Sequence, residues 1–160
     1  MNKRKGFTII EVVLVLAIAG LIFLMVFIAL PALQRNQRDA QRKNDMAQIN
    51  DAYNRCLANA KGRHCDVWTL LTSSYLKMDE WKDPSTGERY LARGISDPGS
   101  APGVNVYSDP ADWELGVVYW NNAGRCLDGK PDSGVWRARA FVAATKLESG
   151  GAVCISNFNE

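Results

Sequence analysis

Residues 6–33 read GFTIIEVVLVLAIAGLIFLMVFIALPAL, and this stretch decides the fold. It contains no charge or amide over the 19 residues from Val12 to Leu30, and its one charged residue is Glu11. A bilayer is crossed by a helix of about 20 apolar residues. The chain of 160 residues holds only one such run, which argues against a polytopic transporter and against an ordinary cytosolic globule.

Positive charge is concentrated before this run. The formal net charge is +2, and Lys3, Arg4 and Lys5 supply three positive charges, so the rest of the chain is slightly acidic. A basic nucleic-acid-binding domain would carry its charge as a patch on the folded part. Flanking lysines and arginines stay on the cytoplasmic side of a membrane, so the sequence predicts one span with its N-terminus inside.

Three interpretations of the N-terminus compete. A cleaved secretory signal would use the small residues Ala17 and Ala19 as its cleavage site. Glu11 would then interrupt the apolar core, and the apolar run continues well past Ala19, which argues against this interpretation. A plain signal anchor explains the basic flank and the apolar run, but it gives Gly6 and Glu11 no role.

The third interpretation explains both residues. The order Lys5-Gly6-Phe7-Thr8-Ile9-Ile10-Glu11 resembles the processing motif of type IV prepilins and pseudopilins. The resemblance implies cleavage between Gly6 and Phe7 by a prepilin peptidase, N-methylation of Phe7, and pairing of Glu11 with the amino group of a neighbouring subunit. A carboxylate inside a membrane helix is costly and is a functional hypothesis by default. Pairing would neutralise both charges and set the axial register of a polymer.

Gly20 and Pro31 bound the segment in which the resemblance implies a kinked or extended helix in assembled subunits. Many family members have a glycine where Gly20 stands, whereas Pro31 comes slightly later than the usual proline of the family. A proline removes a hydrogen bond inside a helix and bends it. We therefore expect the helix to extend between Gly20 and Pro31 in the polymer.

Residues 34–61 continue the same helix beyond the apolar run. Four cations follow one another there: Arg35, Arg38, Arg42 and Lys43. They could form a DNA- or lipid-binding patch, but Asp39 and Asp45 offset them, and Asp39 has Arg35 and Lys43 at i,i+4 spacing. We interpret the polar stretch at 34–45 as a solvated helix surface.

An apolar stripe then predicts contact between the helix and a globular head. Its members recur at helical spacing: Met46, Ile49, Tyr53, Cys56 or Leu57, and Ala60. Lys61-Gly62 is a helix stop, so one helix is predicted from Phe7 to about Lys61.

The fold class is α+β, with a long N-terminal helix that packs by its C-terminal half on a small antiparallel sheet. We divide the chain into a leader (1–6), an apolar membrane and assembly helix (7–33), the polar and then amphipathic half of the same helix (34–61), and a head (62–160). The elements expected in the head are a short helix at Asp66–Leu76, a loop over 93–112 with a strand at Val104–Tyr107, and strands at Leu115–Trp120, Ala138–Leu147 and Ala152–Ser156. The last two strands form a hairpin across Glu148-Ser149-Gly150-Gly151 that resembles the last hairpin of many pilins and pseudopilins. The stretch Asp83-Pro84…Gly87…Tyr90 resembles a connector found in many pseudopilins.

The four cysteines, at positions 56, 65, 126 and 154, form no C-x-x-C pair. Zinc sites usually show such pairs, whereas an even number of cysteines behind an export-type N-terminus favours disulfides in an oxidising compartment. Four cysteines allow three connectivities. We favour Cys56–Cys65, which closes a short loop, together with Cys126–Cys154, which joins distant strands.

Chemistry typical of enzymes is weakly represented, and no cofactor is expected. Gly124 to Lys130 matches most of a phosphate-binding loop, but Pro131 stands where a magnesium-binding Ser or Thr is needed. Asp128 and Asp132, with Ser133, are a weak calcium candidate because the EF-hand spacing is absent. We therefore predict that the chain is not an enzyme.

The resemblance implies a structural subunit of a type IV pilus (fimbrium). The precursor would sit in the cytoplasmic (inner) membrane as a single-pass protein, and the cleaved subunit would polymerise on the cell surface through its N-terminal helix. Its partners would be further copies of the chain in a helical homopolymer, the prepilin peptidase, a pilus assembly platform and the membrane. Nucleic acid would take part only as cargo of the pilus.

Two alternatives stay open. A pseudopilin of a type II secretion or DNA-uptake machine is favoured by the Asp83 connector, whereas the expected disulfide at the C-terminal hairpin favours a pilus exposed to force and to the medium, which we prefer. A membrane-anchored binding domain that never polymerises would share the span. Such an anchor would tolerate the loss of the charge of Glu11, whereas a polymer would not.

Overall fold

The computed structural model describes residues 6–61, 65, 75–77, 79, 81–95, 110–122, 124–132 and 139–158. The chain divides into two compact units, Met1–Asn36 and Gln37–Glu160. Most of the short helix expected at Asp66–Leu76 lies outside the described residues. The strand expected at Val104–Tyr107 lies outside them as well.

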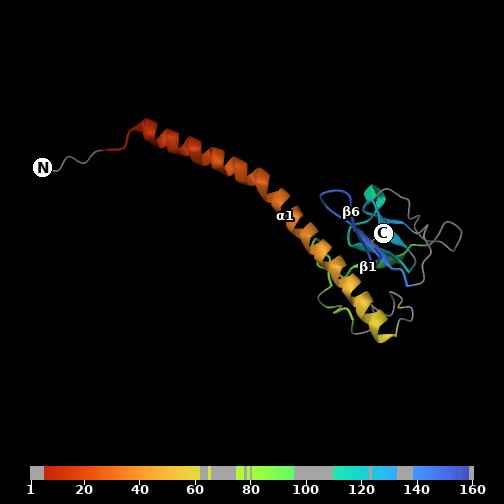
Figure 1. Cartoon of the computed structure of the whole chain (residues 1–160). Coiled ribbons are helices and arrows are strands. Elements are labelled where there is room, and N and C mark those ends of the chain that lie inside the picture. The colour runs from red at the N-terminus through yellow and green to blue at the C-terminus, as the bar shows by residue number, and fades with distance from the viewer. Residues whose placement is uncertain are drawn as a thin grey trace. The chain divides into compact units, whose positions relative to one another are not determined.

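One helix, α1 (Ile9–Asn59), accounts for 51 residues and passes through Gly20 and Pro31 without interruption (Figure 1). It ends in a turn in which Lys61 has a positive φ of 54°, the left-handed conformation that often ends helices. The prediction of a single helix to about Lys61 is confirmed. The extension between Gly20 and Pro31 was expected of the polymer and stays a prediction.

The first unit consists of the apolar part of α1 and the residues just before it. Its large apolar side chains are exposed from Phe7 to Leu33, and Phe7 exposes 88% of its surface. The helix holds a window with a mean hydropathy of 3.2, none of it buried, that is long and apolar enough to cross a membrane. These side chains need an apolar environment that the described residues do not supply.

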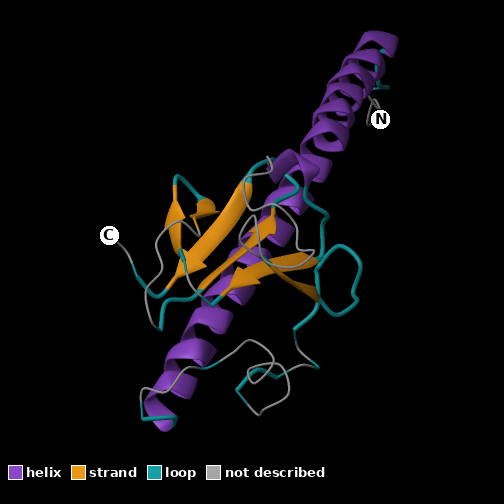
Figure 2. Ribbon diagram, turned by 90° about the vertical axis from the view of Figure 1, so that its right-hand side faces the viewer, coloured by secondary structure: helices purple, strands orange, loops and turns teal. Residues whose placement is uncertain are grey.

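The second unit contains a four-stranded sheet in the order β1-β2-β5-β6 (Figure 2). The strands are β1 (Leu91–Gly94), β2 (Val117–Asn121), β5 (Val142–Lys146) and β6 (Ala152–Ser156). The β2–β5 and β5–β6 pairs are antiparallel, but β1 runs parallel to β2. The expected antiparallel sheet is therefore mixed, because the connection from β1 to β2 crosses over instead of forming a hairpin.

Two short elements complete the described head. A two-stranded hairpin is formed by β3 (Arg125–Leu127) and β4 (Lys130–Asp132), and a single 3₁₀ turn, η1, covers Pro110–Asp112. The β3–β4 turn uses Asp128 and Gly129, both with positive φ, as a two-residue hairpin turn requires. The stretch that resembles a phosphate-binding loop is therefore a hairpin.

The lower part of α1 lies on one face of the sheet (Figure 2). Met46, Ile49 and Tyr53 are buried there against Val118 and Phe141, and the rings of Tyr53 and Phe141 stack with centroids 4.5 Å apart. The predicted apolar stripe is confirmed, because Met46, Ile49, Tyr53 and Cys56 are buried and Leu57 and Ala60 are half-buried against the same core. A second cluster covers the other face of the sheet: Ile95, Trp113, Val117, Tyr119 and Ala144.

Candidate functional site

The peptide bond between Gly6 and Phe7 precedes the first helical residue, Ile9. Both residues are exposed, and nothing lies within 4 Å of the position that a side chain on Gly6 would take. A peptidase needs an accessible backbone outside regular secondary structure, which this position offers. The leader residues Met1 to Lys5 lie outside the described residues.

Glu11 caps the helix to which it belongs. Its Oε2 accepts hydrogen bonds from the backbone N–H of Thr8 at 2.8 Å and from the Thr8 hydroxyl at 2.7 Å. Thr8 precedes the first helical residue and Glu11 is the third, which is the spacing of a capping box. The sequence contains this signal, Thr-x-x-Glu, but the sequence analysis assigned Glu11 only to assembly. Both bonds end on Oε2, so Oε1 meets no donor among the described residues.

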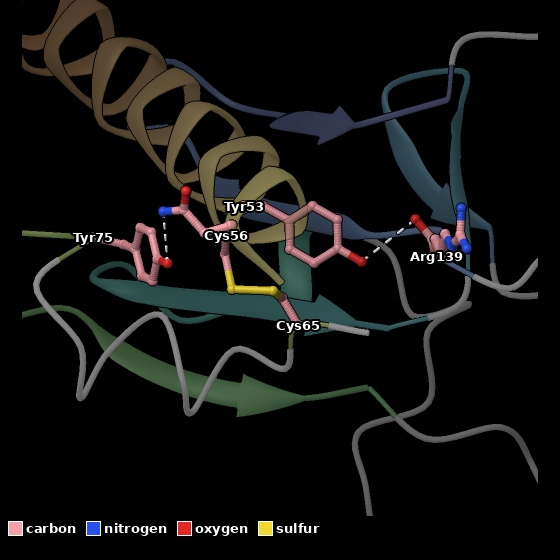
Figure 3. The surroundings of a disulfide bond; sticks show 6 residues. Tyr53, Cys56, Cys65, Tyr75 and Arg139 are labelled. Carbon is pink, nitrogen blue, oxygen red and sulfur yellow. Dashed lines mark hydrogen bonds between the residues drawn. A yellow bond between two sulfur atoms is a disulfide. The ribbon is translucent and has the colours of Figure 1, made fainter. Parts of the chain in front are cut away.

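The disulfide between Cys56 and Cys65 joins the last turns of α1 to the chain that follows (Figure 3). Around it, the Tyr53 hydroxyl donates to the carbonyl oxygen of Arg139 at 3.4 Å, and Asn59 Nδ2 donates to the Tyr75 hydroxyl at 2.9 Å. The disulfide therefore fixes the C-terminal end of α1 beside the core of the head.

The second disulfide joins Cys126 of β3 to Cys154 of β6, at a sequence separation of 28. It attaches the small β3–β4 hairpin to the edge strand of the sheet. Both pairs are the ones that the sequence analysis favoured. The structure describes no free cysteine.

Arg42 lies at the centre of a buried ion cluster that the sequence analysis missed. Its side chain is completely buried. Nε donates to Asp83 Oδ2 at 2.9 Å, Nη1 donates to Asp39 Oδ1 at 3.0 Å, and Nη2 donates to Glu148 Oε1 at 3.0 Å and to Ser85 Oγ at 2.9 Å. One guanidinium thus joins α1, the connector after it and the β5–β6 turn. We call Arg38, Asp39, Arg42, Asp83 and Glu148 the Arg42 cluster.

The β5–β6 turn is held to α1 from two sides of this cluster. Asp39 accepts the backbone N–H groups of Glu148 and Ser149 at 2.8 and 2.9 Å. Arg38 binds the Glu148 carboxylate through both oxygens, at 2.8 and 2.6 Å, in the bidentate geometry that makes such pairs strong. The tip of the C-terminal hairpin is therefore fixed to α1 by charged groups.

The connector, which resembles that of many pseudopilins, contacts α1 through Asp83, Ser85 and Tyr90. Besides binding Arg42, Asp83 accepts the backbone N–H of Ser85 at 2.8 Å and so shapes its own turn. Tyr90 donates from its hydroxyl to Asp45 Oδ2 at 2.9 Å. Gly87, at φ 71°, supplies the left-handed position of this turn. The Asp, Gly and Tyr of this stretch thus have structural roles that a turn signal alone does not reveal.

The charges of the cluster are tuned by burial and by hydrogen bonds. Burial would raise the pKa values of Asp39 and Asp83, but hydrogen bonds from the turn and from Arg42 hold both below the ordinary value of 3.8. The hydrogen bond from Arg38 lowers the pKa of Glu148. Burial instead raises the pKa of Asp45, and its Tyr90 bond does not offset this.

The interpretation of residues 34–45 as a solvated helix is wrong for part of this stretch. Arg42 and Asp39 are buried, and Asp39 pairs with Arg42 rather than with Arg35 or Lys43. The physical reason is long-range, because Asp83 and Glu148 neutralise the charge from elsewhere in the chain. Arg35 and Lys43 are exposed as expected.

The weak calcium candidate gains no support. Asp132 Oδ2 accepts a hydrogen bond from Arg125 at 3.2 Å, and Asp128 is exposed at the hairpin turn. No group of three or more His, Cys, Asp or Glu side chains suited to a metal occurs among the described residues, and Ser133 is not one of them.

Comparison with known proteins gives one finding, and it falls on the N-terminus. No curated protein and no solved structure matches the chain. Residues 1–27 match the family model of the prokaryotic N-terminal methylation motif, and this motif marks the class III signal of type IV pilins and pseudopilins.

Proposed function

We propose that this chain is a structural subunit of a type IV pilus. A prepilin peptidase cleaves the membrane-anchored precursor between Gly6 and Phe7, Phe7 is N-methylated, and the subunit polymerises through residues 7–33. The observation that carries the proposal is the methylation motif over residues 1–27 at the start of a helix whose apolar window has no buried part. The role is structural, and no residue is assigned a catalytic part.

Glu11 has two tasks in this proposal. In the single chain it caps α1 through Thr8. In the polymer its carboxylate also binds the amino group that cleavage creates on Phe7 of a neighbouring copy. Because the cap occupies Oε2, the ammonium group can add at Oε1 without breaking the cap. Pairing removes an unpaired charge from apolar surroundings, where it is costly.

A pseudopilin of a secretion or DNA-uptake machine is the second candidate. It is favoured by the connector, in which Asp83 and Tyr90 hold α1 as described above. The pilus is favoured by the Cys126–Cys154 disulfide, which secures the C-terminal hairpin of a subunit that would bear force outside the cell. In either case the further partners are copies of the chain and an assembly platform in the membrane.

The mass and N-terminal sequence of the native protein test the proposal first. They should be measured on a membrane fraction and on material sheared from the cell surface. A chain that starts at Phe7, carries one extra methyl group and occurs in the sheared material is expected. The same processed chain confined to the membrane would favour the pseudopilin. An intact Met1, or a start near Gly20, would contradict processing altogether.

A substitution at Glu11 separates a polymer subunit from a simple anchor. Glu11→Gln keeps an oxygen that can accept the Thr8 bonds but removes the charge. We expect this variant to be inserted and cleaved normally and to form no filaments. Glu114→Gln, on the exposed Arg93–Glu114 pair of the head, is the matched control and should assemble. Normal filaments from Glu11→Gln would show that the charge of Glu11 has no part in assembly.

A further inference from the structure

The part of α1 in the second unit is held to the head in two different ways. From Met46 to Cys56, apolar side chains are buried against the sheet. From Arg38 to Asp45, the buried side chains are Asp39, Arg42 and Asp45, all of them charged or acidic. The residues between them, at positions 40, 41, 43 and 44, are exposed.

The attachment of residues 38–45 of α1 to the head depends on the Arg42 cluster. Asp39 and Arg42 bind the β5–β6 turn and the connector through hydrogen bonds and ion pairs. Further along α1, Asp45 accepts a single hydrogen bond from the Tyr90 hydroxyl. No apolar residue of α1 that precedes Met46 in the sequence is buried in the described head.

The position of this attachment coincides with the limit of the head. The two compact units divide between Asn36 and Gln37, one residue before Arg38. The first residues of the second unit are thus the ones that the cluster binds. Without the cluster, the next firmly held residues of α1 would be Asp45 and Met46.

We propose that the Arg42 cluster is a clasp that determines the residue of α1 from which the helix moves rigidly with the head. With the clasp closed, the rigid head includes α1 from Arg38 onward. With it open, the hinge between the assembly helix and the head moves to about Asp45, a shift of about 10 Å along the helix. One consequence rests on the proposed function. In a filament, the clasp would fix the position along α1 at which each head separates from the packed helices.

The geometry of the cluster suits a clasp that adds to the stability of the head and also fixes where α1 joins it. The cluster joins three segments that are distant in sequence, and one of them is the tip of the hairpin rather than its strands. The β5–β6 strands are held independently by their five-residue pairing, and the Cys126–Cys154 disulfide ties β6 to β3. Opening the cluster therefore leaves the sheet and the apolar contact of α1 in place.

Hydrogen–deuterium exchange of the full chain in detergent micelles tests the clasp without any filament. The main variant is Glu148→Gln, which weakens the ion pairs that this side chain makes with Arg38 and Arg42. It creates no cavity in the core. Arg42→Lys is the second variant, because it keeps the charge but loses the planar fork of donors. Glu114→Gln is the matched control, since it weakens an Arg–carboxylate pair that is exposed.

We expect the backbone amides of residues 38–44 to exchange about tenfold faster in Glu148→Gln and Arg42→Lys than in the parent chain. In the parent chain these amides should already exchange faster than those of residues 46–56 and of β5, because opening the clasp is a smaller event than unfolding the head. The control should leave the exchange of residues 38–44 unchanged. Unchanged exchange at 38–44 would overturn the proposal. Exchange of residues 38–44 at the same rate as residues 46–56 and β5, in the parent chain and in both variants, would also overturn it, because the cluster would then open only when the whole head unfolds. Neither result depends on whether the chain forms a pilus.

Discussion

Arg42 Nε lies 2.9 Å from Asp83 Oδ2, and the Arg42 side chain is completely buried while Asp83 is 1% exposed. A charge taken out of water must find partners, and Arg42 finds three carboxylates. The centre of the head's polar structure is thus an arginine on a helix that sequence patterns assign to solvent. The loss of this residue should have a larger effect than the loss of any exposed cation.

Arg42→Met should destabilise the head by about 3–5 kcal/mol, because it leaves buried carboxylates without their main partner. Urea denaturation of the chain in micelles, followed by tryptophan fluorescence, measures this change. The matched control is Arg55→Met, which breaks an exposed i,i+4 pair with Asp51 and should cost about 0–0.5 kcal/mol. Equal effects of the two variants would mean that burial of Arg42 contributes no stability.

Acid should destabilise the head through the same cluster. The pKa values of Asp39, Asp83 and Glu148 lie below the ordinary values of 3.8 and 4.5, so the unfolded chain takes up protons first as the pH falls. Their contribution is complete above these ordinary values and is lost as the pH drops below them. The raised pKa of Asp45 acts in the opposite direction, but it is one group against three.

Urea denaturation at a series of pH values between about 7 and 3 checks this dependence. The free energy of unfolding should fall in the acid range, and Glu148→Gln should make the decline shallower because one of the three groups no longer titrates. A decline of the same steepness in both proteins would locate the acid sensitivity elsewhere.

Two aspartates on α1, Asp45 and Asp39, should respond differently to removal of their charge. Burial raises the pKa of Asp45, so its ionised form is disfavoured in the fold, and Asn can still accept the Tyr90 bond. Asp45→Asn should leave stability unchanged or raise it by about 1 kcal/mol at neutral pH. Asp39→Asn should lower it, because Asp39 accepts two backbone N–H groups and pairs with Arg42.

Thermal unfolding of these two variants side by side provides the measurement. The matched variant Tyr90→Phe should be less stable than the parent chain by about 1–3 kcal/mol, since it deprives the buried Asp45 carboxyl of its donor. A loss of stability in Asp45→Asn as large as in Asp39→Asn would show that Asp45 needs its charge.

The elements that could be predicted from sequence are those with local signals. The apolar run and the stripe from Met46 define α1, and the turn at Glu148–Gly151 defines the β5–β6 hairpin. The strand β1 was not predicted, because its four residues are all exposed and its partner, β2, is parallel and distant in sequence. The β3–β4 hairpin had a turn signal in Asp128-Gly129, which was considered only as part of a phosphate-binding loop.

The candidate site divides in the same way. Gly6, Phe7 and Glu11 stand in a contiguous motif, so the sequence alone indicates them. The Arg42 cluster brings together residues from α1, the connector and the β5–β6 turn, and no spacing rule relates Arg42 to Asp83 or Glu148. Short-range rules paired Asp39 with Arg35 and Lys43, but the fold supplied buried partners that bind more strongly than exposed ones.

The two disulfides should differ in the stability that they contribute. In the chain-entropy description, closing a loop of 28 residues between Cys126 and Cys154 contributes about 3–4 kcal/mol, and closing one of 9 residues between Cys56 and Cys65 contributes about 2.5 kcal/mol. Replacing each pair by alanines and measuring urea denaturation tests this order. The Cys126–Cys154 variant should have the lower midpoint, because its loss also frees the β3–β4 hairpin from β6. The reverse order would mean that the Cys56–Cys65 bond stabilises the end of α1 by direct contacts, such as those around Tyr53 and Tyr75, rather than by restricting the unfolded chain.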